Sequence, residues 1–278
     1  MTTASATQLT KIAEGREAEL FAYGDGRVLR LYRTPRQAAD VQHQATILQT
    51  AAAAGIRVPT YFETVTVEGR PGLVLERIEG DDLFELIARR PWRVWSLSRL
   101  TARLQAEMHG QTAPPELVPT REAHRRAIGR ASSSGAPPEF TNPALERLDR
   151  LPDGDRFLHG DLHPGNIMLT ADGPVVIDWT NATRGSPEAD FARTTMMLRL
   201  GDPPPGAPRL IVFFARFARS LMIRTYEGTY RKAHPIDEDL YRAWQLPVAV
   251  ARLAENIPSE TQKLHAFIRK LLPGDAVN

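Results

Sequence analysis

The sequence of 278 residues contains no cysteine. This absence excludes disulfides, thiol catalysis and cysteine-based zinc sites, and it fits a cytoplasmic protein. Lysine is scarce, and the few that occur are Lys11, Lys232, Lys263 and Lys270, so arginine supplies most of the positive charge. The formal net charge of +2 is too small to predict a nucleic-acid or membrane partner.

Long apolar runs are missing as well. The apolar stretch from Leu210 to Ala215 is bounded by arginines and is far shorter than the roughly 20 residues that cross a bilayer. Residues 1–10 lack the basic start and apolar run of a secretory signal. We therefore expect a cytoplasmic protein without a membrane partner, and the sequence leaves its oligomeric state open.

The first third of the sequence is typical of strands interrupted by one helix. Gly24-Asp25-Gly26 is a strong hairpin signal, and Gly55 is a typical helix stop. Alternating apolar residues predict strands at residues 11–14, 18–23, 27–32, 60–67 and 73–78, and helix formers predict a helix at residues 37–54.

The remainder of the chain predicts helices. They are expected at residues 82–89, 94–109, 121–130 and 143–151, and from Asp190 to the end with a break at residues 201–205. Ser132 to Gly135 predicts a mobile loop. A sheet-rich lobe at residues 1–79 followed by a helical lobe at residues 80–278 indicates the α+β class.

The segment that carries the most information is HGDLHPGNIML at residues 159–169. It runs into an apolar strand, a turn at Gly173-Pro174 and a second strand that ends in IDW. Antiparallel pairing of these strands would bring Asn166, just before the first strand, next to Asp178, at the end of the second. Asp161 lies on the loop that leads into this hairpin.

These three residues match the needs of phosphoryl transfer. One carboxylate must orient the attacking hydroxyl and accept its proton, and further oxygen atoms must hold Mg²⁺ against the nucleotide phosphates. Asp161 fits the first role, and Asn166 and Asp178 fit the second. Each alone could be a turn-capping residue, but their combination favours the catalytic interpretation.

With these motifs the sequence resembles the aminoglycoside phosphotransferase and choline kinase-like family. HGDLHPGN is similar to its catalytic loop and IDW to its metal-binding segment. The resemblance implies a two-lobed, protein-kinase-like fold, ATP and Mg²⁺ as cofactors, and a small-molecule hydroxyl as the acceptor. The acceptor could be an aminoglycoside or another antibiotic, an amino sugar or a choline-like metabolite, and ATP is not distinguished from GTP.

The resemblance also assigns a nucleotide site in the lobe at residues 1–79, and places catalysis and acceptor binding in the lobe at residues 80–278. EGREAE at residues 14–19 is similar to the nucleotide loop, which would place Gly15, Arg16 and Ala18 at the phosphates. LERIEG at residues 75–80 is similar to the hinge, where Glu76 and Ile78 would face adenine. Taken alone, Gly15 is equally well explained as a hairpin residue.

Two residues depart from the family pattern. Arg30 occupies the position of a phosphate-binding lysine, and Gln44 occupies that of the glutamate which holds the lysine. Because arginine is larger and more rigidly forked, either Arg30 binds phosphate in an altered geometry or the nucleotide site is weakened. The second alternative corresponds to a pseudokinase or regulatory module. The intact Asp161, Asn166 and Asp178 favour an enzyme, and a protein kinase fits less well because no peptide-docking segment follows.

Other residues are expected to play supporting or structural roles. His159 is expected to form structural hydrogen bonds, His163 to support the loop rather than contact substrate, and Asp190 to accept backbone hydrogen bonds that hold the catalytic loop. Several acidic residues are expected to form a solvated helical face rather than a pocket for a cationic acceptor: Glu227, Asp237, Glu238, Asp239 and Glu255.

Overall fold

The computed structural model describes residues 9–14, 18–33, 38–201 and 209–272 of the chain. The chain divides into two compact units. The first contains residues 1–83 and 165–180, and the second contains residues 84–164 and 181–278. Residues 165–180 thus group with the N-terminal part of the chain, and the lobe boundary after residue 79 stays a prediction.

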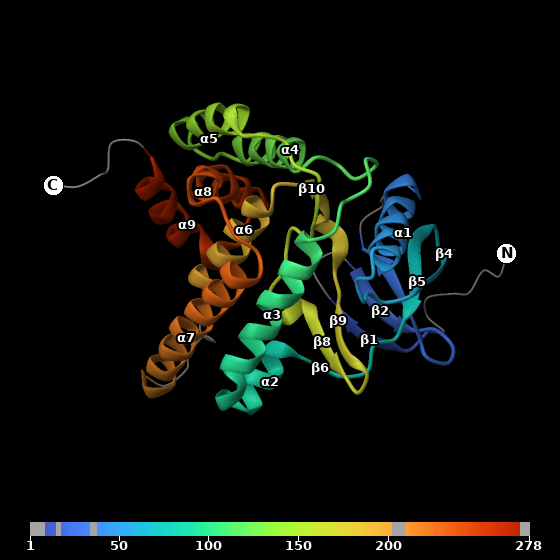
Figure 1. The fold of residues 1–278 in the computed structure, drawn as a ribbon. Coiled ribbons are helices and arrows are strands. Elements are labelled where there is room, and N and C mark those ends of the chain that lie inside the picture. The colour runs from blue at the N-terminus through green and yellow to red at the C-terminus, as the bar shows by residue number, and fades with distance from the viewer. Residues whose placement is uncertain (1–8, 15–17, 34–37, 202–208, 273–278) are drawn as a thin grey trace. The chain divides into compact units, whose positions relative to one another are not determined.

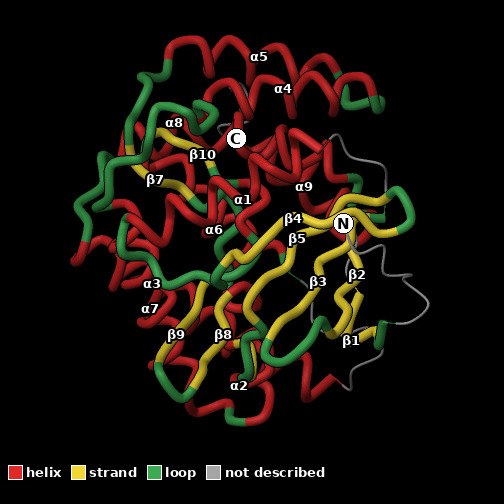
Figure 2. Tube along the Cα trace, turned by 90° about the vertical axis from the view of Figure 1, so that its right-hand side faces the viewer, coloured by secondary structure: helices red, strands yellow, loops and turns green. Residues whose placement is uncertain are grey.

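The first unit contains an antiparallel sheet of five strands in the order β1-β2-β3-β5-β4 (Figure 2). Its strands are β1 (Lys11–Glu14), β2 (Ala18–Ala22), β3 (Arg27–Tyr32), β4 (Tyr61–Val67) and β5 (Arg70–Glu76). The strand β5 begins earlier than its apolar pattern predicts. Glu68 and Gly69 both have positive φ, so a tight two-residue turn starts the pairing directly at Arg70.

Alternation along β3 separates the two faces of this sheet. Leu29 and Leu31 are fully buried and pack with Phe21, Val67 and Val74 in a core cluster. Arg30 therefore points to the opposite face. The helix α1 (Ala38–Ala53) packs against β4 and β5.

The hairpin predicted around the IDW motif forms a second, three-stranded sheet in the first unit. Its order is β6 (Asp81–Asp82), β8 (Ile167–Thr170) and β9 (Gly173–Val176). The turn predicted at Gly173-Pro174 is wrong, because both residues already pair with β8 and the turn lies at Ala171-Asp172. The backbone N–H of Val176 also donates to the carbonyl of Arg57, at 3.0 Å. These bonds attach the hairpin to the N-terminal part of the chain.

The second unit is mostly helical, which confirms the α+β class. It contains α2 (Leu83–Arg89), α3 (Val94–His109), α4 (Thr120–Ser133), α5 (Pro138–Arg150), α6 (Pro187–Leu200), α7 (Arg209–Ala233), α8 (Glu238–Arg252), α9 (Pro258–Leu271) and the antiparallel pair β7 (Arg156–Leu158) and β10 (Thr183–Gly185). The helices α3 and α7 lie side by side (Figure 1). Within the described residues, no helix is both long and apolar enough to cross a membrane.

The mobile loop predicted at residues 132–135 is wrong in part, and so is the predicted start of the next helix. The helix α4 continues through Ser133, and α5 begins at Pro138 rather than at Pro143. Proline is well suited to the first helical position, as Pro138 shows. The following turns are held by an apolar stripe, since Phe140, Ala144 and Leu148 are all buried.

Candidate active site

The carboxylate of Asp161 lies in a network of charged side chains within the second unit. Arg193 on α6 donates through Nη2 to its Oδ1, at 2.8 Å, and Nη1 of Arg252 on α8 lies 3.7 Å from the same oxygen. The side chain of Asp161 is 20% exposed, whereas that of each arginine is 10% exposed. Asp161 is therefore oriented by two largely buried cations.

Two glutamates complete this network from the C-terminal segment. Glu255 accepts from both Arg193 and Arg252, at 2.8 Å each, and Glu260 receives a two-fold hydrogen bond from Arg252, at 3.0 and 3.1 Å. Burial alone would lower the pKa of Arg193, but the carboxylates of Glu255 and Asp161 raise the pKa above its ordinary value. The guanidinium of Arg193 therefore stays charged, and together the two arginines hold the carboxylates in a fixed geometry.

Asp190 fastens the start of the catalytic loop to α6. Its carboxylate accepts hydrogen bonds from the backbone N–H groups of His159, at 3.2 Å, and Gly160, at 2.8 Å. It is also bonded to His109 and Gln105 on α3, at 3.1 and 3.0 Å. Burial alone would raise the pKa of Asp190, yet hydrogen bonding and charge from these neighbours place the pKa well below its ordinary value. Asp190 is thus a buried anion that ties the loop to two helices.

The backbone at Gly160 admits no side chain. Its φ is +76°, and an added Cβ would lie 2.1 Å from the carbonyl oxygen of Asn181. The preceding His159 is fully buried and accepts through Nδ1 from the backbone N–H of Asp161, at 3.2 Å. His163 stacks on Phe84 of α2, with ring centroids 5.7 Å apart. These contacts fix the loop on both sides of Asp161.

The hairpin of the first unit places Asn166 and Asp178 at neighbouring positions. The carbonyl of Asn166 accepts from the backbone N–H of Ile177, at 2.9 Å. Asp178 has a φ of +60°, in the left-handed region that few residues other than glycine adopt. Such conformations concentrate at functional sites, where the surrounding fold maintains them.

Asn166 and Asp178 offer an amide oxygen and a carboxylate, and this set of donors is suited to Mg²⁺. Among the described residues, no group of three or more His, Cys, Asp or Glu side chains could hold a metal. Mg²⁺ is typically held by one or two protein groups and completed by phosphates and water. The chemistry of Asn166 and Asp178 therefore fits a metal that binds together with a nucleotide.

Arg30 lies against this carboxylate in the first unit. Its Nη2 donates to Oδ1 of Asp178, at 2.9 Å, and to the hydroxyl of Thr180, at 3.2 Å. The Thr180 hydroxyl itself donates to Oδ1 of Asp178, at 2.8 Å. Gln44 accepts from the hydroxyl of the buried Tyr32, and the guanidinium of Arg30 lies over the ring of the same tyrosine, 5.6 Å from its centroid. The two departures from the family pattern are therefore connected through Tyr32.

The remaining residues expected at the nucleotide lie in or beside the five-stranded sheet. Ala18 is buried on β2 opposite Tyr32. Glu76 ends β5, and its carboxylate accepts from the backbone N–H and hydroxyl of Thr60, at 3.0 and 2.8 Å. Ile78 follows on the segment that leaves the sheet and is half-buried. Gly15 and Arg16 lie outside the described residues.

Several residues of the site were not identified from the sequence. Arg193 lies in the GSPEADFAR segment, but nothing in that string indicates that its side chain contacts Asp161. The acidic residues expected on a solvated face are mostly in ion pairs: Glu227 with Arg199 and Arg231, Glu238 with Arg231, Asp239 with Arg242, and Glu255 with Arg193 and Arg252. Asp237 caps α8.

Comparison with known proteins links this geometry to one family of enzymes. The model of the phosphotransferase enzyme family matches residues 8–235. No curated protein sequence matches the chain.

Solved structures share the fold at low sequence identity. Aminoglycoside phosphotransferase APH(3'')-Id from Streptomyces rimosus, solved in complex with ADP and streptomycin, is 17% identical with a TM-score of 0.56, and the match covers 87% of this chain and 92% of that one. Macrolide 2'-phosphotransferase from Brachybacterium faecium is 17% identical with a TM-score of 0.57, covering 98% and 95%. Choline kinase from Cryptosporidium parvum is 13% identical with a TM-score of 0.58, covering 95% and 87%. These similarities confirm the protein-kinase-like fold.

Proposed function

Because the chain belongs to the phosphotransferase enzyme family, we propose that it transfers the γ-phosphoryl group of ATP to a hydroxyl of a small molecule. The acceptor would be an aminoglycoside or another antibiotic, an amino sugar or a choline-like metabolite. The structural relatives act on compounds of these kinds according to their names. The donor is proposed from the ADP bound to the Streptomyces enzyme.

Asp161 would act on the acceptor. Its carboxylate accepts the proton of the attacking hydroxyl while the acceptor oxygen forms a bond to the γ-phosphorus. The bond between that phosphorus and the bridging oxygen breaks, and ADP leaves with the bonding electrons. Arg193 and Arg252 would hold the carboxylate in a fixed direction, because a general base must be correctly aimed before transfer.

Asn166 and Asp178 would hold Mg²⁺ on the nucleotide. When bound, this ion neutralises charge on the phosphate oxygens. Arg30 supports the proposal as a phosphate-binding residue, since its guanidinium lies 2.9 Å from Asp178 and is therefore directed to the place where the phosphates would be held. Nucleotide binding would then exchange one anionic partner of Arg30 for another.

The observation that carries the proposal is the orientation of Asp161 by Arg193. A merely structural aspartate in a turn would cap backbone N–H groups. Here the backbone N–H groups of His159 and Gly160 are bound by Asp190, and the Asp161 carboxylate accepts from the charged guanidinium of Arg193. This division of roles is suited to a carboxylate that must present an oxygen to an incoming hydroxyl.

A screen of acceptors tests the proposal. The purified chain is incubated with ATP, Mg²⁺ and a panel of aminoglycosides, macrolides, amino sugars and choline, and products are identified by mass. We expect one class of acceptor to gain a phosphoryl group with wild type and with Asp172→Asn. Asp172 is a matched control because it is a highly exposed carboxylate on the turn of the same hairpin. Asp161→Asn should form no detectable product in the same time.

Nucleotide binding without phosphoryl transfer would favour the alternative of a pseudokinase. If the protein binds ATP with Mg²⁺ but forms no phosphorylated product with any acceptor class, the replacement of the family lysine by Arg30 has weakened catalysis. Equal product formation by wild type and Asp161→Asn would refute the role of Asp161 while leaving a phosphotransferase in place.

A further inference from the structure

We infer that a groove between α3 and α7 is a binding site for a small oligophosphate anion. This basic groove has a volume of about 640 Å³ and is lined by Trp95, Arg99, Arg103, Arg224, Thr225, Gly228, Thr229, Lys232 and Ala233. Its volume is that of a small-molecule site. None of its residues belongs to the candidate active site, so the inference stands apart from the proposed function.

The charge of the basic groove has one sign. Its lining includes four cationic side chains and no carboxylate. Within the part of the chain that the structure describes, Arg99, Arg103, Arg224 and Lys232 form no ion pair. The neighbouring Arg231, on the same helix, pairs with both Glu227 and Glu238. On α7, carboxylates thus neutralise Arg231 beside the groove, but among the described residues none pairs with Arg224 or Lys232 within it.

The cations of the groove repel one another, and an anionic ligand would remove this repulsion. Arg99 and Arg103 are one helical turn apart on α3, and like charges at this spacing destabilise a helix. The groove also offers neutral donors, because Thr225 and Thr229 present hydroxyls from successive turns of α7. Guanidinium forks and hydroxyls together match the oxygen atoms of phosphate groups.

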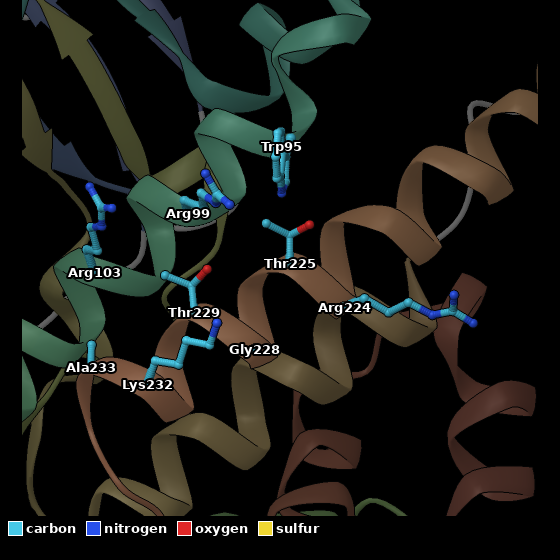
Figure 3. Close-up of a pocket in the computed structure, with 9 residues that line it drawn as sticks. All are labelled: Trp95, Arg99, Arg103, Arg224, Thr225, Gly228, Thr229, Lys232 and Ala233. Carbon is cyan, nitrogen blue, oxygen red and sulfur yellow. The ribbon is translucent and has the colours of Figure 1, made fainter.

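Figure 3 shows how the lining side chains lie. Arg99, Thr225 and Thr229 gather in the space between the two helices, with Lys232 beside them, while Arg103 and Arg224 extend outward on opposite sides. An added Cβ at Gly228 would meet nothing within 4 Å, so the surface there is open. A ligand would therefore contact the central group of donors formed by Arg99, Thr225, Thr229 and Lys232.

The ligand must carry several negative charges. The cations of the groove are exposed to solvent, and a single exposed ion pair contributes little. Useful affinity therefore requires several contacts at once, which a chain of two or three phosphates supplies and a single phosphate does not. The limited volume of the groove favours such a small anion over a nucleic acid, which would need a continuous basic surface.

Trp95 provides a local signal for binding. It is 52% exposed, and the guanidinium of Arg99 lies over its ring at 4.0 Å from the centroid. An anion that draws Arg99 toward itself would disturb this cation–π contact and change the fluorescence of Trp95. The difference between wild type and Trp95→Phe isolates this signal from the other tryptophans and from nucleotide bound near Arg30.

The experiment titrates the protein with inorganic tripolyphosphate and, in a second arm, with ATP. We expect a Trp95-dependent fluorescence change that saturates. Equal affinity for both ligands identifies free oligophosphate as sufficient, whereas tighter binding of ATP shows that the nucleoside contributes. Each lost cation should weaken binding about two- to five-fold, so the double variant Arg99→Glu/Lys232→Glu should weaken it about four- to 25-fold. Affinities of the variants for tripolyphosphate are measured by calorimetry, because Arg99→Glu removes the contact that gives the fluorescence signal.

The matched control is Arg130→Glu/Lys270→Glu, which reverses one exposed arginine and one exposed lysine on α4 and α9. It should change the affinity less than about two-fold. Gly228→Gln is a second test that fills the open surface without altering charge, and it should likewise weaken binding. An equal loss in the control, full competition by sodium chloride at the same ionic strength, or a signal that persists in Trp95→Phe would overturn the inference.

Discussion

At the scale of single residues, Arg30 carries the main chemical difference from the family pattern. We expect Arg30→Ala to lower kcat/KM for ATP roughly 10- to 100-fold, because a charge-assisted hydrogen bond contributes about 1.5–3 kcal/mol. Arg33→Ala is the matched control, since Arg33 follows the same strand but pairs with the exposed Glu14. Steady-state kinetics with varied ATP test the difference. If Arg30→Ala retains wild-type kinetics, Arg30 does not bind phosphate.

Arg193 is expected to act through Asp161 rather than on the nucleotide. Arg193→Lys keeps the charge but loses the planar guanidinium, whose Nη2 donates to both Asp161 and Glu255. A small misplacement of a catalytic group costs up to about 100-fold, so we expect kcat to fall about 10- to 100-fold while KM for ATP stays unchanged. A parallel rise in KM for ATP, or no change in kcat, would show that Arg193 does not position Asp161.

At the scale of elements, the connection from β7 to the catalytic loop depends on Gly160. Placing alanine at a positive φ destabilises a protein through the backbone conformation alone. Gly160→Ala should destabilise the protein by well more than this backbone cost, because the new Cβ would collide with the Asn181 carbonyl. Gly135→Ala measures that backbone cost alone, about 1–2 kcal/mol, since Gly135 also has positive φ but no atom within 4 Å of its added Cβ. Urea unfolding compares the two. Equal destabilisation would show that the loop can move away from Asn181.

The network that joins α3, α6 and the catalytic loop makes stability depend on pH. The pKa of Asp190 is lower in the folded state than in the unfolded chain. The ionised carboxylate therefore contributes its full share to the free energy of unfolding above the unfolded pKa, near 4. This share is lost as the pH falls from there through the folded pKa. Asp190→Asn should therefore cost about 1–3 kcal/mol at pH 7, and the difference from wild type should narrow below about pH 4. A difference that stays constant down to pH 3, measured by urea unfolding, would exclude the charge of Asp190 as the cause.

At the scale of the whole molecule, the sequence predicts those helices and strands whose bounds depend on neighbouring residues. The strand at residues 27–32 and the helix at residues 94–109 have the predicted bounds, because apolar periodicity and turn residues act over a few positions. The hairpin likewise follows from its two apolar segments, although its turn lies two residues earlier than predicted, and it places Asn166 beside the strand that leads to Asp178.

The sequence does not predict contacts between distant segments. The ion pairs of Asp161 join the catalytic loop to α6 and α8, and their partners become known only when the helices are packed. Gln44 illustrates the same limit, since its place in the sequence does not indicate that its side chain binds Tyr32. Helix ends are also weakly specified, as Ser133 shows by closing α4 rather than opening a loop.

The most direct test of the account separates nucleotide binding from turnover in Asp161→Asn. Binding of ATP with Mg²⁺ is measured by calorimetry, and transfer of the γ-phosphoryl group is measured with the acceptor identified by the screen. We predict binding close to that of wild type and turnover lowered about 10²- to 10⁴-fold, because only the base for the acceptor hydroxyl is lost. Asp178→Ala should instead weaken binding that depends on Mg²⁺. Turnover near the wild-type rate in Asp161→Asn would contradict the account.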